Sequence, residues 1–235
     1  MSSHNLREIA FDTETTGFDP EVGHRIVEIG CVEMIGHVRT GRAFHAYINP
    51  EREMPKEAEA VHGLSTHFLS DKPRFSEIAK GFLEFIEDSH LVIHNAGFDM
   101  KFINHELFLA EHPTIAMERA VDTLPLARQK FPGQPNSLDA LCRRFNVDLS
   151  LRTKHGALLD AELLADVYLE LRGGRQTSFG LTSTTALSDT VEEAFEAVKV
   201  DIPERHFEPS AEELARHRAF IEKLKNPMWL QVEAE

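Results

Sequence analysis

Two carboxylates stand at the end of a strand-like segment, where their chemistry is conspicuous. Asp12 and Glu14 form an Asp-x-Glu pair, and residues i and i+2 of a strand point to one face. Two carboxylates on one face repel each other unless a cation lies between them. A solvent-facing strand end or a helix cap is the alternative interpretation of this pair.

A third carboxylate, Asp160, lies on the apolar side of an expected helix. At about 100° per residue, Leu164, Val167 and Leu171 fall on its side, while the other acidic residues of the segment face away. A buried ionised carboxylate is costly without a partner or a metal. We therefore expect Asp160 to face a cation, with a salt bridge to a core arginine or lysine as the alternative.

Asp99 and His155 complete the set of residues that could do chemistry. Asp99 lies in the first turn of a helix with Phe102 and Ile103 on its side, which predicts a carboxylate that faces inward. A first-turn acid favoured by the helix dipole is the alternative. His155 precedes the helix that carries Asp160, where a capping or surface role is the alternative to catalysis.

Four carboxylates in one site would require positive charge, and two divalent cations would supply it. Oxygen-rich sites suit Mg²⁺ or Mn²⁺ rather than zinc. Two such ions about 3.5–4 Å apart suit in-line attack of water on a phosphodiester. His155 is the candidate base for that water, because the pKa of an imidazole is ordinarily near neutrality.

The elements that must position these residues alternate between strand and helix. Segments with strand character are 7–13, 25–35, 43–48 and 91–93. Segments with helical spacing are 75–86, 98–110, 124–131, one that Ser137 caps, and 156–172. This order predicts an α/β or α+β domain with a mixed sheet.

Composition excludes several classes of protein. The 235 residues include 25 basic and 39 acidic side chains, giving a net charge of −14, which does not suit indiscriminate coating of nucleic acid. The two cysteines make neither a disulfide framework nor a zinc set. We find no apolar run of about 18 residues and no signal-peptide core, so we expect a cytoplasmic protein with no membrane contact.

The chain changes character after residue 174. We assign residues 1–174 to a catalytic domain, 175–187 to a flexible linker rich in Gly, Ser and Thr at its margins, and 188–235 to a helical tail. The tail contains two expected helices. One begins near Ser188 or Asp189 and ends near Val200, and the other begins at a Ser210 capping box and ends near Lys225.

Five segments in order carry a resemblance to a known family. They are 11–17 (FDTETTG), 60–64 (AVHGL), 94–99 (HNAGFD), 136–142 (NSLDALC) and 155–161 (HGALLDA). Together they resemble the DEDDh family of 3′–5′ exonucleases, and within it the proofreading subunits of bacterial DNA polymerase III. The resemblance covers most of residues 7–174. It implies a ribonuclease H-like fold, with a mixed five-stranded sheet flanked by helices.

The resemblance also implies roles for individual residues. It makes Asp12, Glu14, Asp99 and Asp160 the ligands of two metal ions and His155 the general base. The positions near the bound 3′-terminal nucleotide would be Asp12, Glu14, Thr15, Gly17, His62, His94, Phe98 and Asp160. For two of these positions the residues leave an alternative open, a core role for Phe98 and a helix-end role for His62.

Two partner segments follow from the same resemblance. Gln176, Phe179 and Leu181 look like a weak form of the peptide that binds the sliding clamp (the beta subunit), although Gly180 departs from the stronger pattern. A plain linker is the alternative. Trp229, with Phe220, Ile221 and Leu224, would contact the polymerase alpha subunit. A small self-packed pair of helices is the alternative for this tail.

The expected function is removal of mispaired nucleotides from single-stranded or frayed DNA 3′ ends by two-metal-ion hydrolysis. Two rival interpretations are an RNA-trimming exonuclease with the same five residues and a scaffold subunit without catalysis. The linker and tail argue against the first, because a compact RNA exonuclease has no need of them. The complete set of five residues argues against the second.

Overall fold

The computed structural model describes residues 6–150, 154–174 and 209–223. The chain divides into two compact units, Met1–Thr182 and Ser183–Glu235. The predicted linker (175–187) lies outside the described residues, as does the first helix predicted for the tail. No described helix has the length and apolar character needed to cross a bilayer.

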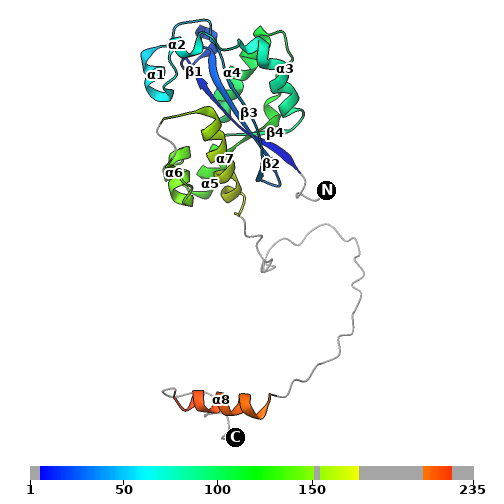
Figure 1. The fold of residues 1–235 in the computed structure, drawn as a ribbon, viewed down its shortest axis with the longest axis vertical. Helices are drawn as coiled ribbons and strands as arrows, with labels where there is room; N and C mark the ends of the chain where they lie inside the picture. The colour runs from blue at the N-terminus through cyan, green and yellow to red at the C-terminus, as the bar shows by residue number, and fades with distance from the viewer. Residues whose placement is uncertain (1–5, 151–153, 175–208, 224–235) are drawn as a thin grey trace, which may run out of the picture. The chain divides into compact units, whose positions relative to one another are not determined.

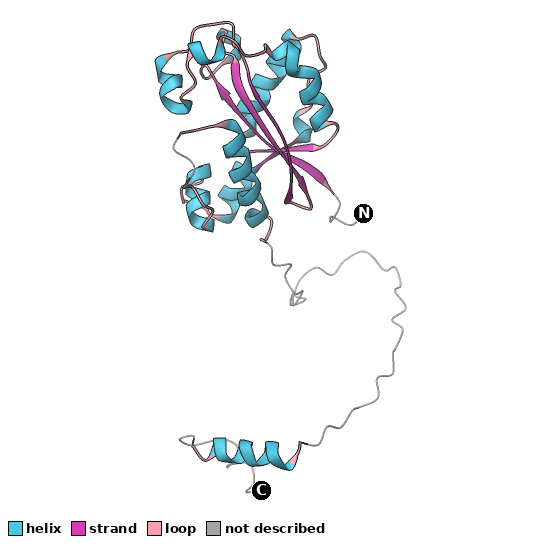
Figure 2. Ribbon diagram, viewed as in Figure 1, coloured by secondary structure: helices cyan, strands magenta, loops and turns pink. Residues whose placement is uncertain are grey.

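A five-stranded mixed sheet forms the centre of the first unit (Figure 2). Its order is β3-β2-β1-β4-β5, with β1 antiparallel to β2 and parallel to β4. The strands are β1 (Arg7–Thr15), β2 (Ile26–Ile35), β3 (Val38–Tyr47), β4 (His90–Ile93) and β5 (Ala120–Asp122). Since β1, β4 and β5 are parallel, their carboxyl ends meet at one edge, where ligands bind in open α/β sheets.

Helices cover both faces of this sheet (Figure 1). The helices of the first unit are α1 (Lys56–His62), α2 (Thr66–Leu69), α3 (Phe75–Ile86), α4 (Ala96–Leu109), α5 (Thr123–Lys130), α6 (Leu138–Phe145) and α7 (Ala157–Leu171). On one face Ile9 and Phe11 of β1 pack against α3 and α4. On the other face Ala10 packs against α7, as the alternation of strand side chains requires.

The predicted α/β class and mixed five-stranded sheet are confirmed, whereas three short elements escaped prediction. β5 has three residues, which is too short for a periodic pattern. α1 and α2 have seven and four residues, and α1 ends at Gly63, whose φ of 81° only glycine adopts readily. β3 begins at Val38 rather than Ala43, because the first part of this edge strand is exposed on both sides and shows no alternation.

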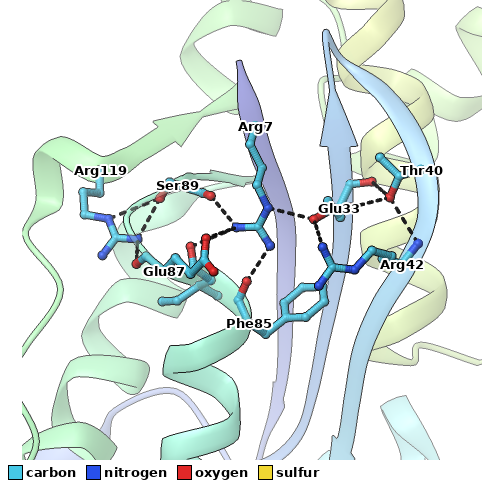
Figure 3. A network of polar contacts seen from close by, with 9 residues as sticks. Arg7, Glu33, Thr40, Arg42, Phe85, Glu87, Ser89 and Arg119 are labelled. Atoms are coloured by element: carbon cyan, nitrogen blue, oxygen red, sulfur yellow. Dashed lines mark hydrogen bonds and ion pairs between the residues drawn. The ribbon is translucent and has the colours of Figure 1, made fainter. Parts of the chain in front are cut away.

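An arginine network closes the end of the sheet opposite the carboxyl edge (Figure 3). Arg7 at the start of β1 donates hydrogen bonds to Glu33 Oε1 at 2.7 Å, Ser89 Oγ at 2.6 Å and the Phe85 carbonyl at 2.7 Å. Arg119 donates to the Ser89 carbonyl at 2.8 Å. The two guanidinium groups thereby satisfy carbonyls at and beyond the end of α3 and tie β1 to the loop that enters β4.

The second unit is described over one helix, α8 (Ala211–Ile221). Ser210 Oγ accepts from the Glu213 N–H, and the Glu213 carboxylate accepts from the Ser210 N–H. This reciprocal arrangement is the predicted capping box. The helix ends at Ile221, four residues before the predicted end near Lys225.

The start of α7 rests directly on Gly30 of β2. A Cβ placed on Gly30 would lie 2.2 Å from the Ala157 carbonyl oxygen, so only glycine fits there. We predict that Gly30→Ala destabilises the fold by about 1–3 kcal/mol, because the backbone of α7 must move. Urea denaturation should show this loss as a lower midpoint of unfolding.

Gly81→Ala is the matched control for this substitution. Gly81 lies inside α3, and an added Cβ would make an ordinary 3.7 Å contact with Phe44. Because alanine is the better helix former, we expect Gly81→Ala to keep or raise stability. Equal stability of Gly30→Ala and the unchanged chain would contradict the packing argument.

Candidate active site

Three of the predicted residues converge at the carboxyl edge of the sheet. Ligand atoms of Glu14, His155 and Asp160 all lie within 4.8 Å of one another, a spacing that could hold a metal ion. Glu14 is 9% exposed and Asp160 is 3% exposed. Residues from the end of β1, the loop before α7 and the first turn of α7 therefore form one acidic cluster.

A hydrogen bond orients the imidazole of His155. Its Nδ1 lies 3.2 Å from Asp160 Oδ2. An ionised carboxylate only accepts hydrogen bonds, so this contact places a proton on Nδ1 and leaves Nε2 as the basic nitrogen. The His155 side chain is 50% exposed. This position, half open to solvent and held by a buried carboxylate, suits exchange of a proton with water.

Asp99 is buried, as the sequence predicts, and β1 holds it. The Thr13 hydroxyl donates to Asp99 Oδ1 at 2.6 Å, and Asp99 is 4% exposed. Burial raises the pKa of the Asp99 carboxyl to about 7, against the opposing effect of the Thr13 hydrogen bond. No described lysine or arginine is ion-paired with this carboxyl, so its charge needs another source of compensation.

Asp12 precedes Thr13 on β1 and is half-buried. Strand alternation places it on the same face as Glu14. Asp12 and Asp99 are not members of the group within 4.8 Å, so among the described residues only three of the five predicted positions form that tight cluster. Asp99 is nonetheless joined to Thr13, the residue between Asp12 and Glu14. All five positions thus belong to neighbouring parts of one sheet edge.

A cavity of about 510 Å³ adjoins this cluster. Its lining comes from the end of β1, the turn after it, α1 and α4, and comprises Thr13, Glu14, Thr15, Thr16, Gly17, Phe18, His24, Pro55, Glu57, Ala58, Val61, His62 and Phe98. Five of the predicted nucleotide positions are therefore in this wall: Glu14, Thr15, Gly17, His62 and Phe98.

The turn after β1 is rigidly built. The Thr15 hydroxyl donates to the Gly17 carbonyl at 2.6 Å, and Thr16 Oγ1 accepts from the Arg25 N–H at 3.0 Å. A Cβ on Gly17 would lie 2.3 Å from the ring of His24. Glycine is thus required for close approach of the backbone to the cavity and to the imidazole behind it.

His62 and Phe98 each combine the two roles that the sequence left open. His62 is the last residue of α1 and also lines the cavity. Phe98 packs on Phe102, with ring centroids 5.0 Å apart, while its other side lines the cavity. His62 is therefore both a helix-end residue and part of the cavity wall. Phe98 is both a core residue and part of the same wall.

His94 is placed differently from the other predicted nucleotide positions. Its Nδ1 lies 2.9 Å from Thr123 Oγ1, and it is not among the residues that line the cavity. Burial lowers the pKa of its imidazole. Contact of His94 with a nucleotide stays a prediction. The clamp and polymerase residues Gln176, Phe179, Leu181 and Trp229 lie outside the described residues, so their roles also stay predictions.

Two features of the site were missed from the sequence. Phe18 is 90% exposed at the cavity rim, and its place directly after the FDTETTG segment was the available signal. Glu28 of β2 lies opposite Glu14 in the sheet register, is 4% exposed and pairs with His45 Nε2 at 2.7 Å. The alternation of apolar and polar residues is irregular around Glu28, between Ile26 and Ile29, so no periodic pattern predicted its burial.

Comparison with known proteins places this site in a family. A family model described as Exonuclease matches residues 9–168. The DNA polymerase III subunit epsilon of Rickettsia felis is 52% identical over 95% of this chain and 98% of its own length. The protein of the same name from Escherichia coli is 48% identical over 76% of each chain.

Solved structures share the fold. Exonuclease X in complex with 5′ overhanging duplex DNA is 26% identical and superposes with a TM-score of 0.56, over 71% of this chain and 90% of that one. The nuclease domain of 3′hExo, a DEDDh family member bound to rAMP, is 17% identical with a TM-score of 0.62, over 73% and 94% of the two chains.

The raised pKa of Asp99 predicts a pH-dependent response to divalent cations. The unfolded carboxyl titrates near 3.9, so from about pH 4 to 7 only the folded chain retains the proton. The stability of the metal-free protein therefore falls as pH rises through this range, and cation binding offsets the loss once the carboxyl is ionised. Calorimetry should show a larger rise in Tm with Mn²⁺ at pH 8 than at pH 5.5.

Asp99→Asn supplies the comparison for this experiment. The amide carries no titratable proton, so the variant should lose most of the pH dependence of the Mn²⁺ effect. An equal rise in Tm at both pH values in the unchanged protein would contradict the role assigned to this carboxyl.

Proposed function

This chain belongs to the exonuclease family, among the epsilon subunits of DNA polymerase III, and from that premise we propose how its residues act on DNA. The chain is a 3′–5′ proofreading exonuclease that depends on divalent metal ions. We propose that the substrate is a mispaired 3′-terminal nucleotide. The single observation that carries the assignment to this site is the cluster of Glu14, His155 and Asp160 beside the cavity.

The side chains at the sheet edge fit a pair of hard divalent cations. Asp12, Glu14, Asp99 and Asp160 offer oxygen ligands, and the buried Asp99 carboxyl has no described cationic partner to balance its charge. Such ligands favour Mg²⁺ or Mn²⁺. When bound, the two ions would supply charge stabilisation to the attacking and leaving oxygens of the phosphodiester. We assign the four carboxylates as their ligands.

His155 is the proposed general base. Asp160 accepts from its Nδ1–H, which leaves Nε2 as the proton acceptor. A base held in this way removes a proton from water as the water attacks phosphorus, and the proton can pass to solvent because the ring is half exposed. The hydrogen bond to Asp160 stabilises the imidazolium that forms.

The cavity explains the preference for a frayed end. At about 510 Å³ it can hold one nucleotide, which must leave the base stack to enter. A mispaired terminus separates at lower cost than a paired one, so the unstacking step itself favours errors. Phe18 at the rim and Phe98 in the wall offer aromatic faces to the base.

The two rival functions differ in what the site must do. A scaffold subunit has no need of a base held against a buried carboxylate, which the structure contains. An RNA-trimming enzyme would use the same cluster, so substrate preference must be measured. Release of nucleotides from 3′-mismatched DNA in excess of RNA, with Mn²⁺ present, is the expected result. Preference for RNA would reverse the assignment of substrate.

The proposed partners supply the affinity for DNA that this acidic chain lacks. DNA and the polymerase are its partners as an epsilon subunit. We propose that the alpha subunit binds the tail around Trp229, and that the beta clamp binds Gln176, Phe179 and Leu181. Tethering to these partners would raise the local concentration of DNA without a basic surface. A cytoplasmic location is proposed on the same grounds.

Substitution of one proposed ligand tests the metal site. We predict that Asp12→Ala lowers nucleotide release by at least 100-fold, because the phosphodiester loses the cation that Asp12 helps to hold. Release of labelled mononucleotide from a mismatched oligonucleotide measures this effect. The exposed Asp88→Ala is the control and should retain full activity. A fully active Asp12→Ala variant with an unchanged Tm would remove Asp12 from the ligand set.

Removal of the tail tests the division of labour along the chain. Deletion of residues 201–235 should leave nuclease activity intact, since the acidic cluster and the cavity lie in residues 13–160. The same deletion should abolish co-elution with the polymerase alpha subunit in size-exclusion chromatography. Co-elution of the truncated chain would refute the assignment of the tail.

A further inference from the structure

One lysine beside the site has no acidic partner among the described residues. Two other cations near the cavity, Arg25 and Lys101, are ion-paired, with Glu106 at 2.8 Å and with Asp19 at 2.9 Å respectively. Lys154, immediately before His155, is exposed and forms no ion pair within the described part of the chain. In a chain of net charge −14, this exposed ammonium group beside the acidic cluster can bind an anionic ligand.

The fold holds this lysine over the end of α1. A Cβ on Gly63 would lie 2.8 Å from Cδ and 2.9 Å from Nζ of Lys154, so the missing side chain of Gly63 makes room for the lysine stem. The loop is also docked by the His155 N–H, which donates to the Val61 carbonyl at 3.4 Å. The ammonium group therefore stands beside His62 and Val61, which line the cavity.

A second hydrogen-bond donor at the same corner lacks a partner. His62 is 6% exposed, and its Nδ1 accepts from the Leu64 N–H at 3.0 Å, which assigns the ring proton to Nε2. That Nε2 is buried with no hydrogen-bond partner in the described structure. Because buried donors almost always form hydrogen bonds, we expect this N–H to donate to an acceptor atom of a ligand. Burial, the largest effect, lowers the pKa of His62, against the opposing effects of the Glu28 charge and the Thr15 backbone.

We propose that Lys154 is a substrate-binding residue that holds a backbone phosphate of the DNA strand over the His62–Gly63 turn. The inference rests on the proposed action on DNA and extends it. Lys154 supplies positive charge, and the adjoining His62 Nε2–H supplies a neutral donor to the same nucleotide. The pair gives the strand a point of attachment that does not depend on the metal ligands. The phosphate is either the scissile group or its neighbour, and the substrates below distinguish them.

The test compares Lys154→Met with Lys154→Arg in the full chain. Methionine keeps the apolar stem over Gly63 and removes the charge, whereas arginine keeps the charge. Lys154→Met should raise KM for a single-stranded oligodeoxynucleotide about fivefold with kcat little changed. The slope of log kcat/KM against log salt concentration should become shallower by about 0.7, as expected for one lost phosphate contact on a single strand. Lys154→Arg should restore both quantities.

Controls separate this proposal from the one on which it rests. Lys80→Met, at an exposed position on α3, should leave KM and the salt slope unchanged. A mononucleotide p-nitrophenyl ester has only one phosphate, so an effect of Lys154→Met on it identifies the scissile group. An effect on the oligonucleotide alone identifies the neighbouring phosphate.

Two outcomes would overturn the assignment. One is an unchanged KM and salt slope in Lys154→Met, and the other is a Lys154→Arg variant as impaired as Lys154→Met. In either case an active unchanged enzyme would leave the exonuclease function standing, whereas an unchanged enzyme that releases nothing from DNA would refute that function instead.

Discussion

Mutual repulsion of carboxylates at the carboxyl edge of the sheet is the constraint on which the rest of the structure depends. Glu14 and Asp160 are nearly buried within a few ångströms of His155, and Asp99 is buried against Thr13 of the same strand as Glu14. Burial raises the pKa of Asp99. Such an arrangement survives because the surrounding fold determines it: α7 is pressed onto Gly30, and α4 is bonded to β1. The buried carboxylates at this edge lower the stability of the metal-free fold, and the same groups favour the binding of cations.

The separation of roles along the chain follows from the same charge distribution. An acidic domain gains little from a general attraction to DNA, so it must recognise the strand end by a few placed donors and an enclosing wall. The cavity beside Glu14 is such a wall, built from the turn after β1 and from α1. Under the proposed function, tethering to the polymerase would present the strand end to this site.

Chemistry-bearing residues were easier to predict from the sequence than the walls around them. Asp160 was recognisable because it is a charged residue on the apolar side of its helix, and its burial agrees with the expectation of an inward-facing carboxylate. The strand β2 and the long helices were recognisable by period. By contrast α1, α2 and β5 are too short for any period to show, and their positions depend on tertiary contacts. The buried Glu28 could not be assigned, since nothing local distinguishes it from an ordinary strand residue, whereas Phe18 had only its place after the FDTETTG segment as a signal. The geometry that joins His155 to Asp160 required the folded chain.

The arginine network at the far end of the sheet has a consequence for how the domain moves. Arg7 and Arg119 bind groups from two segments that are distant in sequence, Glu33 and residues 85–89, and Glu33 also accepts from Arg42 at 2.7 Å (Figure 3). Amide protons of β1 and β4 at this end should exchange with solvent only through cooperative opening of the whole domain. We expect DNA entry and nucleotide release at the opposite edge to leave this framework intact.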